Sequence, residues 1–173
     1  MENIVLIGLM GAGKSTVGKN LASRIGWTFV DTDQLVEKRC GTTISVIFEV
    51  EGEKGFRNRE QKIIEEVMNK KKQVIATGGG APIQLQNRNL LSKGFVVYLF
   101  SEPILVWKRL KTDDSRPILR NSKNLKKTIE SLFYQRDPIY RKLADHVMIG
   151  GNMQVKQLVA NLESTIKSKQ NLK

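Results

Sequence analysis

The chain has 173 residues, of which 40% are hydrophobic and 27% are charged, a composition typical of one folded domain whose core needs no disulfides. Its N-terminal apolar stretch, Ile4 to Met10, is short and lacks the basic leader of a signal peptide, so we expect neither export nor a membrane span. One cysteine, Cys40, and one histidine, His146, exclude an internal disulfide and a His/Cys zinc site within this chain, and they favour the reducing cytoplasm.

The net charge of +12 at pH 7 fits either a nucleic-acid-binding surface or a protein whose ligands are anions. The basic residues are spread along the chain, and the clusters at 70–72 and 167–173 are typical of a helix end and a terminal tail. Aromatic residues make up only 6% of the chain, so few side chains can stack on bases. We therefore expect small anionic ligands, and neither nucleic acid nor a membrane as a partner.

The predicted elements alternate between strands and helices. In chain order, strands are expected at 3–7, 27–30, 73–76, 95–100 and 146–149. Helices are expected at 14–25, 34–40, 43–50, 53–70, 83–92, 102–111, 125–136 and 152–168, the seventh ending before Pro138. The strands are almost continuously apolar, as in strands buried on both faces. This alternation predicts one α/β domain over 1–173, with helices on both faces of a parallel sheet in three layers.

The segment at 8–16 carries the strongest functional signal. Gly8 to Ser15 reads G-x-x-x-x-G-K-S between a predicted strand and a predicted helix, which is the setting of a phosphate-binding loop. The glycines let backbone N–H groups approach an anion, and the helix N-terminus adds a partial positive charge. There Lys14 reaches the β- and γ-phosphates and Ser15 offers an oxygen to Mg²⁺. The pattern predicts a nucleoside triphosphate site; the alternative is a glycine-rich turn without a ligand.

Polar residues also follow the second and third strands, at the edge where parallel sheets bind ligands. Asp31 and Asp33 come directly after the second strand, and residues two apart in an extended segment point the same way. One carboxylate would serve Mg²⁺ and the other would orient an attacking hydroxyl; the alternative is that Thr32 or Asp33 caps the next helix. No aspartate ends the third strand, so Asp31 would take the metal role. The triple glycine at 78–80 forms either a close approach to a ligand or a plain turn.

Two arginines are candidates for binding a carboxylate, for which their planar, forked donors are suited. Arg57 stands four residues after Glu53 on a predicted helix, so it is either a substrate ligand or half of a surface ion pair. Arg136 comes late in its predicted helix, where the alternative role is to complement the helix dipole.

The polar stretch at 112–124 is expected to form a lid. A basic lid would exclude water and neutralise phosphate charge, with Arg116 and Arg120 as the candidates; the alternative is an ordinary surface loop. Arg109 lies on the helix before this stretch, where it either covers a purine ring or stays solvated.

Six motifs, in this order, resemble those of the shikimate kinase family over nearly the whole chain. They are Gly8–Thr16, Asp31–Asp33, Gly52–Arg57, Thr77–Gly80, Arg116–Leu119 and Arg136–Tyr140. The phosphate loop alone is unspecific, whereas the aspartate pair, the Gly-Glu-x-x-Phe-Arg box and the triple glycine together are specific. The resemblance implies a P-loop kinase fold, a five-stranded parallel sheet of order 2-3-1-4-5, a mobile lid and a monomer. It implies transfer of the ATP γ-phosphoryl group to the 3-hydroxyl of shikimate, on the route to chorismate and the aromatic amino acids.

The resemblance also implies roles for single residues. The implied nucleotide-binding residues are Gly11, Ala12, Gly13, Lys14, Ser15, Thr16, Arg109, Arg116 and Gln154. The implied shikimate-binding residues are Asp33, Arg57, Gly78, Gly79, Gly80 and Arg136, and the substrate-binding region is expected at about 31–60. Lys14, Asp33 and Arg116 would be catalytic, and Ser15, with Asp31 acting through water, would serve Mg²⁺. Asp113 and Asp114 depart from the family pattern and would weaken or retune the lid.

Other functions fit part of this pattern. Gluconate kinase shares the phosphate loop and the fold, but it would not require the Gly-Glu-x-x-Phe-Arg box followed by the triple glycine. A nucleotide-dependent nucleic-acid-binding module would suit the charge. A catalytically inactive regulator would not need Lys14, Asp33 and the two carboxylate-binding arginines together.

Overall fold

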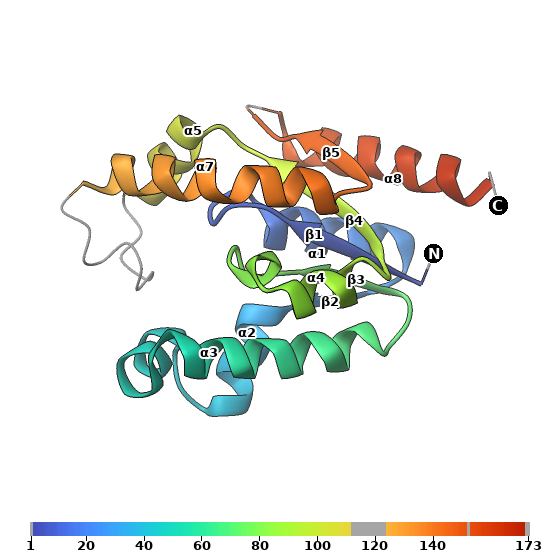
Figure 1. The fold of residues 1–173 in the computed structure, drawn as a ribbon. Helices are drawn as coiled ribbons and strands as arrows, with labels where there is room; N and C mark the ends of the chain where they lie inside the picture. The colour runs from blue at the N-terminus through green and yellow to red at the C-terminus, as the bar shows by residue number, and fades with distance from the viewer. Residues whose placement is uncertain (1, 112–123, 152, 172–173) are drawn as a thin grey trace.

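The computed structural model describes residues 2–111, 124–151 and 153–171, which form a sheet between layers of helices (Figure 1). The strands are β1 (Asn3–Ile7), β2 (Thr28–Asp31), β3 (Gln73–Ala76), β4 (Phe95–Phe100) and β5 (His146–Ile149). The helices are α1 (Lys14–Ile25), α2 (Thr32–Cys40), α3 (Ile44–Met68), the 3₁₀ turn η1 (Ala81–Ile83), α4 (Leu85–Leu91), α5 (Pro103–Leu110), α7 (Leu125–Leu143) and α8 (Val155–Asn171). All paired strands are parallel and their order is β2-β3-β1-β4-β5, which confirms the predicted fold class.

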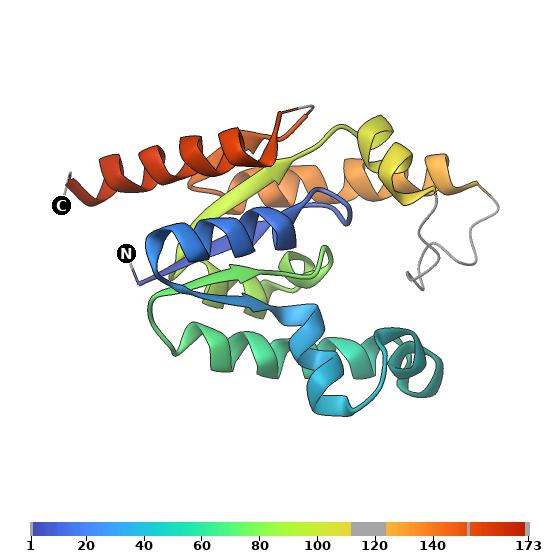
Figure 2. The same ribbon diagram turned by 180° about the vertical axis from the view of Figure 1, so that it is seen from behind.

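The central strand β1 feeds two hydrophobic clusters, one on each face of the sheet. Successive strand side chains point to opposite faces, so Ile4 and Leu6 pack with α1 and α8, whereas Val5 and Ile7 pack with α3, α4 and α7. Figure 1 shows α7, α4 and α3 in front of the sheet, and Figure 2 shows α1 and α8 on the opposite side. All four of these β1 side chains are fully buried, which explains the unbroken apolar run in the sequence.

Pro138 does not end α7, so the helix end predicted at 136 is wrong. A proline removes one helical hydrogen bond, here the bond to the carbonyl of Tyr134. Tyr134 and Pro138 are both exposed, so the interruption lies on the side of α7 that faces away from the core. Beyond the proline, the fully buried ring of Tyr140 packs on that of Tyr98, with ring centroids 5.1 Å apart. Tertiary packing therefore extends the helix past a residue that would end it in isolation.

Smaller differences affect other helix boundaries. The helices predicted at 43–50 and 53–70 are two arms of α3, which bends at Gly52 with φ 69° and ψ −177°. The helix predicted at 83–92 is shorter, because α4 spans Leu85–Leu91 and the 3₁₀ turn η1 precedes it, and the last helix begins at Val155 rather than at 152. Within the described ranges, no helix combines the length and the hydropathy that crossing a membrane requires.

The strand register brings three loops to one edge of the sheet. Ala76 at the end of β3 pairs with Leu6 of β1 on one side and with Asp31 of β2 on the other. The phosphate loop, the aspartate pair and the triple glycine therefore start from neighbouring positions, as expected for a ligand site beyond the carboxyl ends of parallel strands.

Candidate active site

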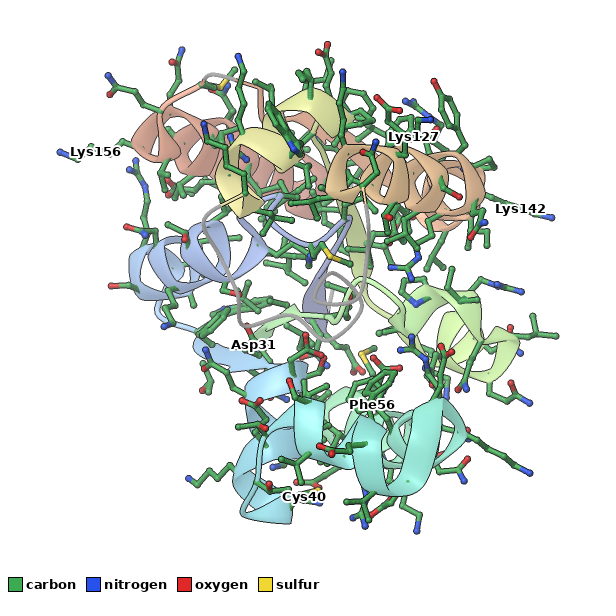
Figure 3. The ribbon with its side chains drawn as sticks, turned by 90° about the vertical axis from the view of Figure 1, so that its left-hand side faces the viewer. Asp31, Cys40, Phe56, Lys127, Lys142 and Lys156 are labelled. Atoms are coloured by element: carbon green, nitrogen blue, oxygen red, sulfur yellow. The ribbon has the colours of Figure 1, made fainter. Side chains whose placement is uncertain are left out.

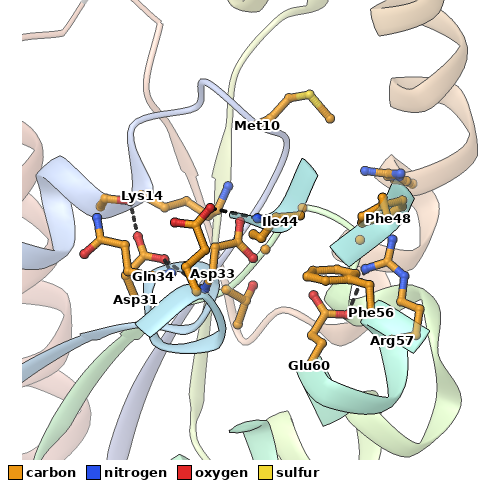
Figure 4. A pocket seen from close by; sticks show the side chains of 17 residues that line it. Met10, Lys14, Asp31, Asp33, Gln34, Ile44, Phe48, Phe56, Arg57 and Glu60 are labelled. Atoms are coloured by element: carbon orange, nitrogen blue, oxygen red, sulfur yellow. Dashed lines mark hydrogen bonds and ion pairs between the residues drawn. The ribbon is translucent and has the colours of Figure 1, made fainter. Parts of the chain in front are cut away.

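A pocket of about 380 Å³ opens where these loops meet (Figure 4). Its walls come from the phosphate loop, the start of α2, both arms of α3, the glycine turn after β3, and α7. The predicted site residues that line it are Lys14, Ser15, Asp31, Asp33, Arg57, Gly78, Gly79, Gly80 and Arg136. Residues from six separate segments of the sequence thus share one cavity.

The phosphate loop has the geometry of an anion site. Gly8, Gly11 and Gly13 have φ values of 141°, 72° and 94°, which side chains other than glycine rarely adopt. Gly13 is the N-cap of α1 and supplies no side-chain hydrogen bond, so the first N–H groups of α1 remain available to an anion. The Nζ atom of buried Lys14 donates to the carbonyls of Gly8 at 2.9 Å and Leu9 at 2.8 Å. The ammonium group therefore lies over the loop that would cradle the phosphates.

Asp31 joins the phosphate loop to α2. Its Oδ2 accepts a hydrogen bond of 2.6 Å from Ser15 Oγ, and its Oδ1 accepts from the N–H groups of Asp33 at 3.1 Å and Gln34 at 3.3 Å. Asp31 is thus the N-cap of α2, and the alternative that Thr32 or Asp33 is the cap is wrong. Asp33 lies in the first turn of α2 rather than in an extended segment, but both carboxylates still line the pocket, as predicted.

Arg57 is only 8% exposed, so the alternative that it forms half of a surface ion pair does not describe its environment. It does pair with Glu53, at 3.2 Å, but its Nη1 also donates to Glu60 Oε2 at 2.8 Å. Glu60 is fully buried and was missed from the sequence, although it stands on the same helical face three residues after Arg57. In Figure 4 both side chains lie beside Phe56 at the wall of the cavity.

Glu60 is a perturbed carboxyl in the pocket. Burial raises its pKa from 4.5 to about 7, against the lowering effect of Arg57, and the charge of Asp33 adds to the rise. The pKa of Arg57 is also raised, because the interactions with Glu60 and Glu53 outweigh the lowering effect of burial. The guanidinium group is therefore held as a cation inside the pocket wall.

The first glycine of the turn makes room for carboxylates. A Cβ on Gly78 would stand 2.5 Å from Asp33 Oδ1 and 2.9 Å from Glu60 Oε1. The N–H of Gly78 donates to Thr32 Oγ1 at 3.1 Å, which fixes the turn against the start of α2. Any side chain at this position would push on the two acidic groups.

Gly80 makes room for Arg57, whereas Gly79 lies against the phosphate loop, where a Cβ would stand 3.3 Å from the backbone nitrogen of Met10. A Cβ on Gly80 would stand 2.2 Å from Arg57 Nη2, and one on Gly79 would stand 3.5 Å from Arg136 Nη1. The triple glycine is thus a close approach between the backbone and three charged side chains, Asp33, Glu60 and Arg57, not a plain turn.

Arg136 presents an unpaired donor to this wall. The residue is 7% exposed, and its buried Nη1 has no hydrogen-bond partner among the described residues. Buried charged donors without partners are costly and commonly mark a ligand site. Because α7 continues for seven residues after Arg136, the alternative that it complements the helix dipole does not hold.

Apolar side chains line the pocket beside the charged ones. Met10, Ile44, Phe48 and Phe56 line the pocket, and the rings of Phe48 and Phe56 pack with centroids 4.9 Å apart. Only Phe56 was visible in the sequence, as the aromatic residue of the Gly-Glu-x-x-Phe-Arg box. The cavity therefore suits a compact ligand with a carbon skeleton, a carboxylate and hydroxyl groups.

Arg109 and Gln154 lie outside this pocket, beyond the phosphate loop. Exposed Arg109 donates to the carbonyls of Gly11 and Gly151, both at 3.0 Å, and so connects the phosphate loop with the turn before α8. The Gln154 carbonyl accepts the first hydrogen bonds of α8. Thr16 is exposed in the first turn of α1. The predicted lid arginines, Arg116 and Arg120, lie outside the described residues, as does the rest of 112–123.

A metal ion would find few protein ligands here. Within the described ranges, no group of three or more histidine, cysteine, aspartate and glutamate side chains is arranged to hold one. Ser15 and Asp31 do offer a hydroxyl and a carboxylate oxygen in contact. Such hard oxygen donors suit Mg²⁺, which commonly takes only one or two protein ligands beside phosphate oxygens and water.

The lysines that contribute much of the net charge are distributed over the surface. Figure 3 shows Asp31 and Phe56 toward the middle of the molecule, whereas Lys127, Lys142 and Lys156 point outward from α7 and α8. Among the residues that the structure describes, the cations that line the pocket are the buried Lys14, Arg57 and Arg136.

Comparison with known proteins places this architecture in a family. Residues 10–167 match the family model described as shikimate kinase. A shikimate kinase of Cupriavidus pinatubonensis is 46% identical over 157 residues, which cover 90% of this chain and 81% of that protein. One of Aromatoleum aromaticum is 42% identical over 166 residues, covering 95% and 94%. Among solved structures, the shikimate kinase from Acinetobacter baumannii in complex with shikimate has a TM-score of 0.94 and 40% identity, covering 98% of this chain and 94% of that one.

Proposed function

The chain belongs to the shikimate kinase family, and on that premise we propose that it transfers the γ-phosphoryl group of ATP to the 3-hydroxyl of shikimate in the pocket described above. The products are shikimate 3-phosphate and ADP, on the route to chorismate and the aromatic amino acids. The observation that carries the proposal is the joining, in one cavity, of a phosphate-binding loop with two buried arginines and an aspartate.

The acceptor is bound by the charged and the apolar side chains of the pocket together. Arg57 and Arg136 bind its carboxylate, and Asp33 accepts hydrogen bonds from its hydroxyl groups. The glycine turn allows the ring to approach the backbone, and the apolar side chains cover the ring's carbon face. The unpaired Nη1 of Arg136 supports this role, since a substrate carboxylate would satisfy it.

Phosphoryl transfer then needs position and charge. The 3-hydroxyl oxygen attacks the γ-phosphorus while the bond from that phosphorus to the β–γ bridging oxygen breaks, and ADP leaves with the electron pair. Asp33 orients the hydroxyl and accepts its proton. Lys14 and the N-terminal N–H groups of α1 stabilise the charge on the phosphoryl oxygens. The proximity of Lys14 and Asp33 in one pocket supports both roles.

Ser15 and Asp31 would hold Mg²⁺, Ser15 directly and Asp31 through water. The ion would supply charge neutralisation on the β- and γ-phosphates. The 2.6 Å contact between the two side chains supports a shared role, and the oxygen donors fit the ion.

Arg109 and Gln154 would bind the nucleoside. Arg109 stacks its guanidinium on adenine, supported by its place between the phosphate loop and the turn before α8. Arg116 closes over the phosphates with the proposed lid at 112–124; this role stands on the sequence alone. We also propose a cytoplasmic monomer, which size-exclusion chromatography with light scattering tests for its oligomeric state.

The experiment that tests the function is a coupled assay of ADP release from ATP and Mg²⁺, with and without shikimate. Shikimate-dependent, saturable release is the expected result. Gluconate tests the nearest enzymatic alternative, and DNA and RNA test the nucleic-acid-binding one. ADP release that does not respond to shikimate would contradict the proposal while leaving the nucleotide site intact.

A further inference from the structure

Tyr140 stands one helical turn after Arg136 on α7, and both side chains face the interior. Residues four apart lie on one face of a helix, so the two residues approach the glycine turn together. Arg136 lines the pocket, whereas fully buried Tyr140 lies behind it, among the residues of the hydrophobic core.

The hydroxyl of Tyr140 has a defined partner in the site. It donates a hydrogen bond to the carbonyl oxygen of Gly79. A hydroxyl inside an apolar core is unfavourable unless it is hydrogen-bonded, and phenylalanine would fill the same space without that cost. Burial raises the pKa of Tyr140 to about 12, against the charge of Arg136 and a hydrogen-bonding contact with it, both of which lower this pKa. A phenol is in any case protonated at neutral pH and acts as a donor.

This bond fixes the orientation of the peptide between Gly79 and Gly80. The described residues contain no cis peptide bond, and in a trans peptide the carbonyl and the following N–H point in opposite directions. With the Gly79 carbonyl held toward Tyr140, the Gly80 N–H points away from that hydroxyl. No hydrogen bond from the Gly80 N–H to another described residue is found, in contrast to the N–H of Gly78, which is bound to Thr32.

Gly80 lines the pocket, and Arg136 Nη1 lies next to Gly79. The Gly80 N–H and Arg136 Nη1 are two donors without partners among the described residues. Tyr140 links them, because it follows Arg136 on α7 and binds the carbonyl that precedes the Gly80 N–H. The Tyr140 ring is itself braced by Tyr98, whose hydroxyl donates to Asp137 of α7 at 2.9 Å.

We propose that Tyr140 is a positioning residue for the acceptor. Its hydroxyl holds the Gly79–Gly80 peptide in the orientation in which the Gly80 N–H and Arg136 bind the substrate carboxylate together. This inference rests on the proposed function, in which Arg136 is a ligand of the shikimate carboxylate.

The test is Tyr140→Phe, which keeps the ring and removes the donor. The KM for shikimate is expected to rise roughly three- to tenfold, the effect of one lost hydrogen bond, while kcat and the KM for ATP stay within about twofold. With the methyl ester of shikimate, whose carboxylate is masked, the loss in kcat/KM is expected to be smaller. An equal loss for both acceptors would indicate a merely structural role and overturn the proposal.

Tyr134→Phe is the matched control, because it makes the same change on the same helix at a side chain that is 73% exposed. It is expected to leave all kinetic constants unchanged. A double-mutant cycle with Arg136→Lys adds a second criterion. If Tyr140 acts with Arg136, the effects of the two substitutions on the KM for shikimate are not multiplicative, whereas multiplicative effects contradict the coupling.

A measurement on the protein without substrate distinguishes the role of Tyr140 from the proposed function. In ¹H–¹⁵N spectra, Y140F is expected to move the amide resonance of Gly80, and Y134F is not. Shikimate binding by calorimetry together with an unmoved Gly80 resonance overturns the role of Tyr140 alone. A wild-type protein that does not bind shikimate overturns the proposed function and, with it, this role.

Discussion

Arg57 packs so closely on Gly80 that an added methyl group would clash with it: a Cβ on Gly80 would stand 2.2 Å from Arg57 Nη2. Gly80 has φ −92° and ψ −13°, a conformation that alanine adopts without strain. Gly80→Ala therefore displaces a guanidinium group and does not distort the turn. The KM for shikimate is expected to rise about tenfold or more, with the KM for ATP and the melting temperature little changed.

Gly78→Ala is the matched comparison, because its Cβ would press on Asp33 rather than on Arg57. It is expected to lower kcat as well as shikimate affinity, since Asp33 is the proposed proton acceptor. Steady-state kinetics with each substrate varied in turn distinguish the two variants. An unchanged KM for shikimate in folded G80A would mean that Arg57 does not bind the acceptor.

Asp31 combines two roles that substitution can separate. Asparagine caps a helix as well as aspartate does but lacks the charge, so Asp31→Asn should retain the melting temperature and lower the apparent affinity for Mg²⁺. Asp31→Ala also removes the cap, which costs about 1 kcal/mol and, for a domain of this size, roughly 2–4 °C in melting temperature. Magnesium titrations of activity and thermal melts measure the two effects. Equal magnesium dependence in D31N and the wild type would rule out the metal role.

Glu60 makes the free energy of unfolding of the protein depend on pH. Its pKa is raised from 4.5 to about 7 in the folded protein, mainly by burial, so the folded state binds this proton more tightly than the unfolded chain does. The stabilisation is complete below pH 4.5 and is lost as the pH rises through about 7. Glu60→Gln is expected to remove this slope, as seen in urea unfolding at several values between about pH 5 and about pH 8.

Glu53→Gln is the control for that slope, because Glu53 contacts the same arginine from a side chain that is 67% exposed. It is expected to leave the wild-type pH dependence in place. Parallel curves for E60Q and the wild type would show that Glu60 titrates normally.

Arg109 is expected to affect the nucleotide alone. Arg109→Ala removes the proposed stacking on adenine and should raise the KM for ATP roughly three- to tenfold, with the KM for shikimate unchanged. Lys108→Ala is the control, since it removes the neighbouring exposed cation. A change in the KM for shikimate, with the KM for ATP unchanged, would contradict the role of Arg109 in binding the nucleoside.

The sheet was predictable because its strands are short, mostly apolar runs followed by glycine or polar residues, and both features are local. The pocket residues after those strands were predictable for the same reason. The path of α7 through Pro138 was not, because it depends on the packing of Tyr140 against Tyr98 on a distant strand. Glu60 was missed because its burial depends on how α3 packs beneath the glycine turn. Arg116 and the lid at 112–124 stay predictions.

The triple glycine restricts sequence change at one wall of the pocket. Alanine in place of Gly78 or Gly80 would collide with charged groups, so the proposed recognition of the carboxylate and hydroxyls depends on glycine at these two positions. Ile44 and Phe48, on the first arm of α3, line the same pocket and are only partly buried. Substitutions that adapt the pocket to another acceptor of the same charge would therefore fall at Ile44 and Phe48, while the residues that bind the carboxylate stay the same.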